Sequence, residues 1–439
     1  MELLLKSFAK VKYARIKCDG ITVIAGENNT GKSTIGKTLF SLYNSALNLS
    51  DKINNQRKQE IKKVLEMYMF SYINGLDISR ERVSIRSIRE NVNDIFEEIS
   101  LLGEEIQEDE ILKLIEAYII KYYGKNSEDR DNEKLEDISN KIINIINLPD
   151  KKIELEVMTR YFQNIFSNEI NNVADDKLPA QIELTIKNKK MNLSFLENRC
   201  NNFEAQYNIL NNAFYIDNPF IVDDLNEINN WRFASNRLKD HIISALSIEK
   251  QDLMDGVINT VSAQEKLKDI YRILEKVVAG EITQNVNGDY YFYSKKLKNQ
   301  IQIKINNLST GLKSFVLIKM LLEKGELNER DVLILDEPEI HLHPQWQIYY
   351  AELIVLLQKE FDLTIIITTH SPYFIDAIEV FSAKYKISDK VNYYLSDILD
   401  DYSVEVRDVT DNIELIYKKL ADPMQQLENL RNEIINNVE

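Results

Sequence analysis

The sequence predicts an α/β fold, in which a mixed or largely parallel sheet is flanked by helices and interrupted by a large helical insertion. Three features indicate this class. Short apolar runs typical of buried strands occur near both ends of the chain, at residues 21–25, 332–335 and 363–368. Helical periodicity follows the first run and separates the other two. Between them, residues 51–178 are rich in Lys, Glu, Asn and Ile and poor in Gly and Pro, which is typical of helices.

The composition limits the classes of function. The chain has 439 residues, 44% of them hydrophobic, so it can form extensive cores and is not generally disordered. Its 54 Lys and Arg are outweighed by 70 Asp and Glu, giving a net charge of −16. This excess argues against general binding of polyanions and leaves room only for a local basic patch. With 12 Gly, 7 Pro and 4 His, the positions of these rare residues are informative.

The cysteines and the N-terminus bear on the compartment. Cys18 and Cys200 cannot form a disulfide framework, and we expect two packed thiols in a reducing environment. The first residues have too short an apolar run for a secretory signal. No stretch approaches the roughly 18 apolar residues of a membrane span. We therefore expect a cytoplasmic protein that does not associate with membranes.

The first half of the chain divides into two predicted parts. Residues 1–50 form the N-terminal part of the α/β domain, with a helix predicted from Lys32 to Tyr43. The insertion, residues 51–178, shows no sustained heptad repeat, so no long coiled coil is predicted. Within it, the acidic run at 94–110 is typical of a solvated helix face, and the polar stretch at 125–134 of an exposed loop.

Residues 179–280 are predicted to link the insertion to the second part of the α/β domain. Alternation of apolar and polar residues at 181–186 predicts one strand, and 212–219 predicts another that ends in a turn. Helical periodicity returns between residues 236 and 278.

Residues 281–395 form the C-terminal part of the α/β domain. Aromatic and apolar residues at 290–293 and 300–305 predict paired strands around a turn at Asn287-Gly288. A helix is predicted at 312–322.

The same part contains a strand–helix–strand unit. The strands at 332–335 and 363–368 are apolar throughout, and the helix at 344–359 joins them. Such strands are covered on both faces, as in a parallel sheet. Residues 396–439 are predicted to form a C-terminal strand and helix extension.

A phosphate-binding motif follows the first buried strand. Residues Gly26–Ser33 match the pattern G-x4-G-K-[ST] between a predicted strand and a predicted helix. Its glycines let main-chain N–H groups and the positive helix end surround a phosphate. Lys32 is expected to reach the β- and γ-phosphates, and the Ser33 hydroxyl to ligate Mg2+. The alternative is a flexible glycine loop before an ordinary helix.

Two adjacent carboxylates end the strand at 332–335. Asp336 is expected to hold Mg2+ through its water shell, and Glu337 to orient and deprotonate the attacking water. Adjacent carboxylates at a strand end are common in proteins, but their combination with the phosphate-binding motif favours nucleotide hydrolysis.

Two further motifs carry polar groups to the ends of elements. Residues Leu308–Ser314 place the Ser309 hydroxyl and the Gly311 backbone just before a helix, which forms either a second anion site or a simple helix N-cap. His370 ends the strand at 363–368 and is a candidate phosphate sensor, although a lone histidine is more often structural.

Together these motifs resemble the ATP-binding-cassette ATPases of the RecF/SMC/OLD branch. The resemblance covers about residues 1–45 and 280–385 and includes Asp336–Pro344 and Thr369–Pro372. It implies an ABC-type P-loop ATPase head that forms a head-to-tail homodimer, or a higher oligomer, with ATP sandwiched between subunits. The implied catalytic residues are Lys32, Glu337 as base and His370 as switch histidine, and the implied metal residues are Ser33 and Asp336. The implied ATP-binding residues are Gly26, Asn28, Asn29, Thr30, Gly31, Lys32, Ser33 and Thr34, with Ser309 and Gly311 from the other subunit.

The sequence departs from the family pattern at two points. Thr310 stands where transporter cassettes usually have Gly, and we assign no Q-loop glutamine. Two acidic or histidine-rich segments also have alternative interpretations. Glu339, His341 and His343 have the spacing of metal ligands, but the resemblance favours a loop that reaches toward the partner subunit. The aspartates at 397, 400 and 401 suggest a nuclease metal cluster, but we favour a turn between terminal strands.

The complete hydrolytic set predicts a Mg2+-dependent ATPase. Its resemblance to OLD-like ATPases, without a nuclease domain in the same chain, implies that ATP-driven dimerisation controls a separate effector, such as a nuclease, in antiphage defence or DNA maintenance. The main alternative is a RecF-like repair ATPase that grips duplex DNA in its dimer cleft, against which the net charge argues. A transporter cassette is disfavoured by the length of the insertion, and a non-catalytic nucleotide switch is a fourth possibility.

Overall fold

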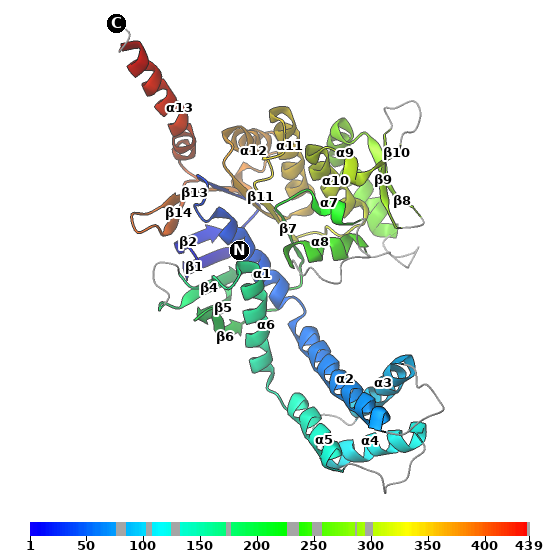
Figure 1. Ribbon diagram of the computed structural model, residues 1–439. Coiled ribbons are helices and arrows are strands. Elements are labelled where there is room, and N and C mark those ends of the chain that lie inside the picture. The colour runs from blue at the N-terminus through cyan, green and yellow to red at the C-terminus, as the bar shows by residue number, and fades with distance from the viewer. Residues whose placement is uncertain are drawn as a thin grey trace. The chain divides into compact units, whose positions relative to one another are not determined.

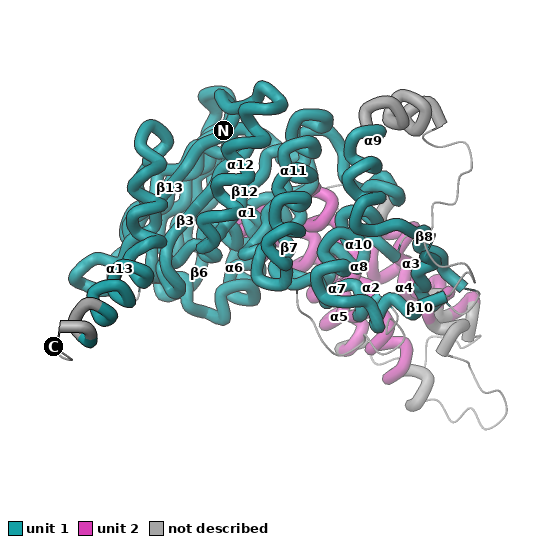
Figure 2. Tube along the Cα trace, turned by 90° about the horizontal axis from the view of Figure 1, so that it is seen from above, with its two compact units in different colours: residues 1–47, 158–439 teal, residues 48–157 magenta. Residues whose placement is uncertain are grey.

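The computed structural model forms two compact units, residues 1–47 with 158–439 and residues 48–157 (Figure 2). The structure describes residues 1–75, 85–101, 108–123, 132–172, 177–225, 237–247, 257–285, 288–294 and 302–436.

The larger unit is built on an eleven-stranded mixed sheet, which confirms the α/β class (Figure 1). The strand order is β6-β5-β4-β1-β2-β14-β13-β3-β12-β11-β7. The strands are β1 (Glu2–Phe8), β2 (Val11–Lys17), β3 (Ile21–Ala25), β4 (Ala180–Ile186), β5 (Lys189–Leu196), β6 (Arg199–Ala205), β7 (Ala213–Ile216), β11 (Val332–Asp336), β12 (Thr364–Thr369), β13 (Val391–Ile398) and β14 (Val404–Asp408).

Five neighbouring strands, β13, β3, β12, β11 and β7, run parallel and form the buried half of the sheet. Helix α1 (Lys32–Ala46) packs on one face, where a Cβ added to Gly36 would lie 2.8 Å from Ile334 Cγ2. Residues Leu333 and Leu335, which point to the opposite face, belong to the core beneath α10 (Thr310–Glu323), α11 (Pro344–Phe361) and α12 (Pro372–Lys384). The predicted parallel strand–helix–strand unit is therefore confirmed as β11–α11–β12.

The other half of the sheet is mostly antiparallel, and β14 joins the two halves, antiparallel to β13 and parallel to β2. Strands β1, β2, β4, β5 and β6 pair by successive antiparallel contacts. Helix α6 (Asp150–Phe166) packs on this half through Phe162, whose ring lies 6.1 Å from that of Phe8 and 4.8 Å from that of Phe195. These aromatic contacts fix the second half of α6 to the larger unit.

A smaller three-stranded sheet lies in the same unit. Strands β8 (Gly280–Gln284), β9 (Tyr290–Ser294) and β10 (Gln302–Lys304) are antiparallel. The predicted pairing of the segments at 290–293 and 300–305 is confirmed by β9 and β10, while Asn287 of the predicted turn lies outside the described residues. Helices α7 (Ile221–Asp224), α8 (Arg237–Ser247) and α9 (Val257–Val277) precede this sheet, and the chain ends in α13 (Glu414–Asn436).

The insertion forms the smaller unit. It contains α2 (Leu49–Gly75), α3 (Ile85–Leu101), α4 (Glu108–Tyr123), α5 (Asn132–Ile146) and the start of α6, around its own core. The unit ends at Val157, within α6, whereas we drew the boundary at residue 178. The difference arises because the second half of α6 buries Met158 and Phe162 in the larger unit. Most of the polar stretch at 125–134, and part of the acidic run at 94–110, lie outside the described residues.

The structure also bears on the expectations for the two cysteines and for membrane-spanning helices. Cys18 and Cys200 are both buried and form no disulfide among the described residues, as predicted for packed thiols. Among the helices that the structure describes, none is both long enough and apolar enough for a membrane crossing.

Candidate functional site

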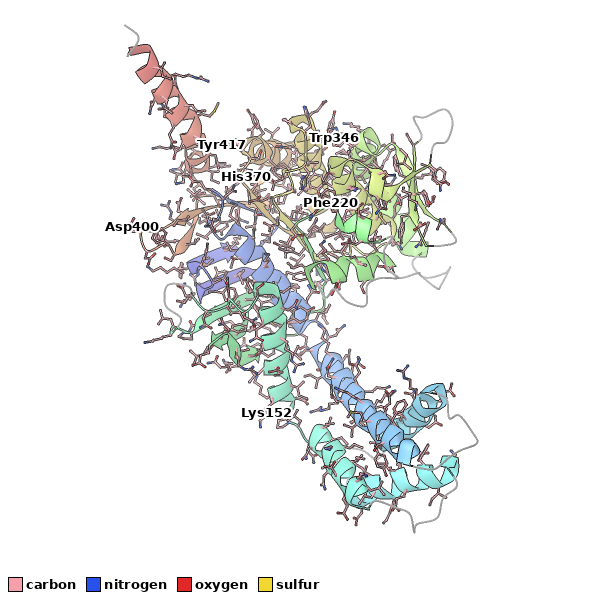
Figure 3. All side chains as sticks on the ribbon, viewed as in Figure 1. Lys152, Phe220, Trp346, His370, Asp400 and Tyr417 are labelled. Atoms are coloured by element: carbon pink, nitrogen blue, oxygen red, sulfur yellow. The ribbon has the colours of Figure 1, made fainter. Side chains whose placement is uncertain are left out.

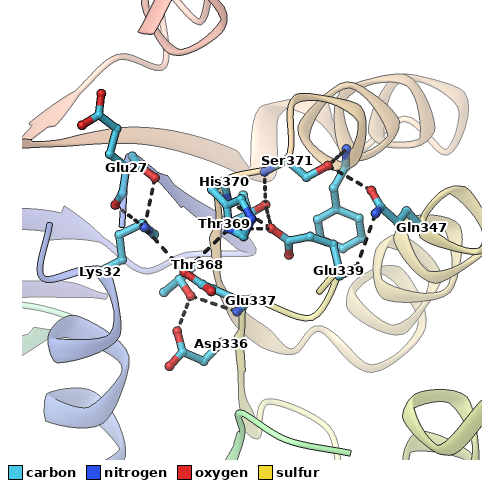
Figure 4. A network of polar contacts seen from close by, with 12 residues as sticks. Glu27, Lys32, Asp336, Glu337, Glu339, Gln347, Thr368, Thr369, His370 and Ser371 are labelled. Carbon is cyan, nitrogen blue, oxygen red and sulfur yellow. Dashed lines mark hydrogen bonds and ion pairs between the residues drawn. The ribbon is translucent and has the colours of Figure 1, made fainter. Parts of the chain in front are cut away.

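The predicted catalytic residues meet where three parallel strands end. Strands β3, β12 and β11 are immediate neighbours, with Ala25 paired to Thr369 and Thr368 paired to Asp336. Since the carboxyl ends of parallel strands lie at one edge of a sheet, the phosphate-binding loop, the acidic pair and His370 come together there (Figures 3 and 4).

The backbone of the loop at 26–31 requires its glycines. Gly31 caps α1 in the left-handed conformation, at φ 74°. A Cβ added to Gly26 would lie 2.6 Å from the Ser396 carbonyl oxygen, so only glycine fits there. The first turn of α1 holds no acidic residue, and main-chain N–H groups at a helix N-terminus favour an anion. This geometry fits a bound phosphate.

The other predicted ATP-binding residues of the loop lie around this turn. Asn28 and Asn29 are exposed, and Asn29 accepts a hydrogen bond of 2.6 Å from Lys10 Nζ. Thr30 is buried, and its carbonyl oxygen accepts a hydrogen bond from Ser396 Oγ at 2.5 Å. Thr34 lies in the first turn of α1.

The Lys32 side chain is buried and contacts the same loop. Only 3% of the residue is exposed, and Nζ donates hydrogen bonds to the carbonyl oxygens of Gly26 (3.0 Å) and Glu27 (2.6 Å). Burial lowers the pKa of Lys32, while the nearby Glu337 carboxylate, 3.6 Å from Nζ, opposes this shift. A buried ammonium group of this kind is stabilised further by an anionic ligand.

Three hydroxyl groups hold the Asp336 carboxylate. Ser33 Oγ donates to Oδ1 at 2.9 Å, and the Thr368 hydroxyl donates to the same oxygen. Tyr215 donates its phenolic proton to Oδ2 at 2.5 Å. Burial, with the charge of Asp336, raises the pKa of Tyr215 well above its ordinary value, so the phenol keeps this proton.

The pair of Ser33 and Asp336 fits Mg2+. This cation prefers oxygen ligands and keeps several waters, using one or two protein groups plus phosphate oxygens. The described residues contain no group of three or more His, Cys, Asp or Glu that could hold a metal ion. The predicted metal residues therefore lie together, in contact with the loop that fits a phosphate.

Glu337 lies between Lys32 and His370. Its Oε1 is 3.6 Å from Lys32 Nζ and 3.8 Å from His370 Nδ1. The residue adopts φ 50°, which is unfavourable for a side chain of this type. Its backbone N–H donates to the Thr368 carbonyl oxygen at 3.0 Å and thereby fixes this conformation. Of the three residues that we predicted as catalytic, Glu337 thus lies within 4 Å of both Lys32 and His370.

Glu339 contacts His370. From the sequence we considered this residue only as a metal ligand. Its Oε1 accepts hydrogen bonds from Thr369 Oγ1 (2.5 Å) and the His370 backbone (3.0 Å), and lies 3.6 Å from His370 Nδ1 (Figure 4). The residue is 3% exposed, and its Oε2 is buried without a hydrogen-bond donor among the described residues. Burial raises the pKa of this carboxyl.

The neighbouring histidines have separate contacts. His343 caps α11, where its side chain accepts a hydrogen bond of 3.4 Å from the Gln345 backbone. The His341 ring lies edge-on to Phe220, 6.0 Å away. In the sequence we expected this loop to reach toward a partner. In the structure its His341 carbonyl oxygen lies against Gly311 of the same chain, 2.9 Å from an added Cβ.

Ser309 occupies the N-cap position of α10, yet its hydroxyl makes no capping hydrogen bond. The residue is exposed. The helix-cap interpretation therefore does not account for this hydroxyl, which remains available to a ligand. Gly311 is buried against the loop after β11 and the Trp346 ring.

Two of the three aspartates at the C-terminal end, Asp400 and Asp401, lie at a turn, as we favoured, whereas Asp397 lies within β13. Asp400 and Asp401 join β13 to β14. Asp401 accepts a hydrogen bond from Lys12 Nζ at 2.8 Å, and Asp397 accepts one from Arg407 at 2.5 Å. Basic side chains, rather than a shared metal position, thus surround these carboxylates.

Comparison with known proteins identifies a family. The family described as an AAA ATPase domain matches residues 1–375. Two curated relatives are the retron Vc95 probable ATPase of Vibrio cholerae serotype O1 biovar El Tor and the endonuclease GajA of Bacillus cereus strain HuB5-5. The first is 25% identical over 88% of this chain and 72% of its own length. The second is 24% identical over 81% of this chain, which spans only 52% of the endonuclease.

Solved structures with low sequence identity are also similar. The SMC head domain from Thermotoga maritima is 12% identical, with a TM-score of 0.35 and coverage of 93% of this chain and 98% of that one. An SMC head bound to the C-terminal winged-helix domain of ScpA is 11% identical, with a TM-score of 0.42 and coverage of 94% and 98%.

The raised pKa of Glu339 predicts how stability depends on pH. Because the folded state binds this proton more tightly than the unfolded state, the wild type should lose stability relative to Glu339→Gln as pH rises above 4.5, the ordinary value for this group. Urea unfolding of both proteins between about pH 5 and 8 measures this difference.

Glu352→Gln is the matched control, and for it we expect the opposite dependence of stability on pH. Burial alone would raise the pKa of Glu352, but hydrogen bonds from Lys384 and Tyr385 lower it overall. The wild type should therefore remain more stable than Glu352→Gln at neutral pH and lose this advantage in acid. A wild type that gained stability relative to Glu339→Gln as pH rose would contradict the assignment.

Proposed function

The chain belongs to the family of AAA ATPase domains, and from this premise we propose that it hydrolyses ATP with Mg2+ in a dimer. The single observation that carries this proposal is the meeting of Lys32, Asp336, Glu337 and His370 at the edge formed by β3, β12 and β11. ATP hydrolysis depends mainly on positioning and charge stabilisation, and this edge supplies both.

Each residue has a role that its contacts support. Phosphate oxygens are bound by the main-chain N–H groups at the start of α1 and by the buried Lys32 ammonium group. Ser33 and Asp336 hold Mg2+, which when bound neutralises charge on the β- and γ-phosphate oxygens. Glu337 Oε1 accepts the proton of the attacking water, and Lys32 and His370 hold this carboxylate in place.

A second copy of the chain completes the site in this proposal. Ser309, at the start of α10, is exposed, and its side chain makes no capping hydrogen bond. At the N-terminus of a helix such a hydroxyl group can bind an anion. In a two-fold dimer, each Ser309 and Gly311 would face the phosphates held by the other subunit. ATP would then act as part of the interface.

We also propose that the dimer controls a separate effector, such as a nuclease. Support comes from the relatives, since one is named as a retron ATPase and another as an endonuclease. The endonuclease is about twice as long as the region it shares with this chain, which matches 52% of it. We propose antiphage defence or DNA maintenance as the setting, as the resemblance to OLD-like ATPases implies. Direct binding of duplex DNA by the dimer is the competing outcome, and a salt-dependent affinity for DNA that requires ATP would favour it.

Replacing the proposed base should separate ATP binding from hydrolysis. Glu337→Gln keeps the shape of the side chain but cannot accept the proton, so turnover should fall at least about 100-fold while ATP-bound dimers accumulate. Phosphate release measures turnover, and light scattering coupled to size exclusion measures the dimer. Glu197→Gln, at an exposed turn between β5 and β6, is the control and should leave both unchanged. Full turnover by Glu337→Gln would exclude this residue as the base.

The composite site predicts complementation between inactive variants. Lys32→Ala removes one half of each site, and Ser309→Arg blocks the other half, so each variant alone should be inactive. Mixed dimers place both changes in one site and leave the other intact. An equimolar mixture should therefore recover about a quarter of wild-type turnover if dimers form at random. A mixture as inactive as its components would contradict the head-to-tail arrangement.

A further inference from the structure

Tyr215 lies beside the acidic pair, although it comes from a distant part of the sequence. It belongs to β7, the edge strand next to β11, and is paired with Ile334. Because side chains two residues apart on a strand share a face, Ile334 and Asp336 point to the same side as Tyr215, toward α1. The sequence predicted this strand but gave no sign of which strand would be its neighbour.

The Tyr215 ring has one well-defined position. The residue is completely buried, and its Cε2 atom lies 3.4 Å from the Cβ position of Gly36 on α1. The Phe40 ring is 5.8 Å away on the same helix. On the backbone side, the Tyr215 N–H donates a hydrogen bond of 3.0 Å to His241 Nε2. Packing against α1 and the main-chain hydrogen bond to His241 thus hold Tyr215 in place independently of its contact with the carboxylate.

The phenol contacts one oxygen of Asp336 and leaves the other to different donors. Tyr215 donates to Oδ2 at 2.5 Å, whereas Ser33 donates to Oδ1 at 2.9 Å and Thr368 donates to that same oxygen. Short hydrogen bonds to a carboxylate are among the strong ones and fix its orientation. With donors on both oxygens, the carboxylate plane cannot rotate freely about its terminal bond.

We propose that Tyr215 is a positioning residue, which orients the Asp336 carboxylate for Mg2+. The inference rests on the proposed ATPase function and deepens it, because it names what aligns the metal-holding group. Outer groups that hydrogen-bond a metal-holding carboxylate typically contribute about 10- to 100-fold in metal affinity. A purely structural tyrosine would instead contribute to folding through its ring, which the phenylalanine variant retains.

The test measures metal binding directly. Mn2+, which replaces Mg2+ and is visible by electron paramagnetic resonance, is titrated into the full chain with ADP present. Tyr215→Phe should weaken Mn2+ binding about 10-fold. Its affinity for the nucleotide in EDTA should stay at the wild-type value, since the phosphate-binding loop is untouched.

Tyr350→Phe is the matched control. Tyr350 is a buried tyrosine, 1% exposed, in the core of the same unit, with its ring 5.0 Å from that of Phe315. This variant should bind Mn2+ like the wild type. A second variant with 4-aminophenylalanine at position 215 keeps a donor on the ring and should restore most of the lost affinity, even if Tyr215→Phe folds less well.

The outcomes separate this inference from the proposed function. If the wild type binds no Mn2+ in the presence of nucleotide, the proposed ATPase function itself fails. If the wild type binds Mn2+ and Tyr215→Phe binds it equally well, only the role of Tyr215 is overturned. An equal loss in Tyr350→Phe would also overturn it, because the effect would then belong to any buried phenol.

Discussion

The site depends on the parallel pairing of β3, β12 and β11. This register places Ala25 beside Thr369, and Thr368 beside Asp336. Groups that are 303 residues apart in sequence, Ser33 and Asp336, thereby come within hydrogen-bond distance. In sequence, the helical insertion follows α1 and precedes β4, a strand of the antiparallel part of the sheet, so it does not separate β11 from β12.

The second constraint is the balance of charge at this edge. Three carboxylates, of Asp336, Glu337 and Glu339, surround a space that is proposed to receive a polyanion, and each is compensated differently. Hydroxyl donors hold Asp336 for a cation, whereas Lys32 and His370 flank Glu337. Burial raises the pKa of Glu339 and so favours its neutral form. Without such compensation, repulsion between these carboxylates and phosphate would oppose binding.

Much of this site could be predicted from the sequence, because the relevant groups form short motifs with fixed spacing. Residues Gly26–Ser33 and the Asp336-Glu337 pair follow apolar strand runs, and local chemistry alone identifies them. Tyr215 and Thr368 could not be found in this way, since their roles arise from strand pairing in three dimensions. Glu339 was visible only as part of a metal-like pattern, because its burial beneath His370 is a property of packing. The boundary between the two units differs from the one that we drew for a similar reason, because it falls within helix α6, whose buried residues Met158 and Phe162 pack in the larger unit.

The central claim, that this sheet edge binds Mg2+ and ATP between two copies of the chain, is tested most directly by hydrogen–deuterium exchange of Glu337→Gln with and without the nucleotide. The account predicts protection at residues 26–34, 336–339 and 368–370 on nucleotide binding. It also predicts protection at residues 309–313, which belong to the opposing subunit's site. Protection at the first three segments without the fourth would contradict the shared site, and an unchanged exchange pattern at all four would contradict nucleotide binding at this edge.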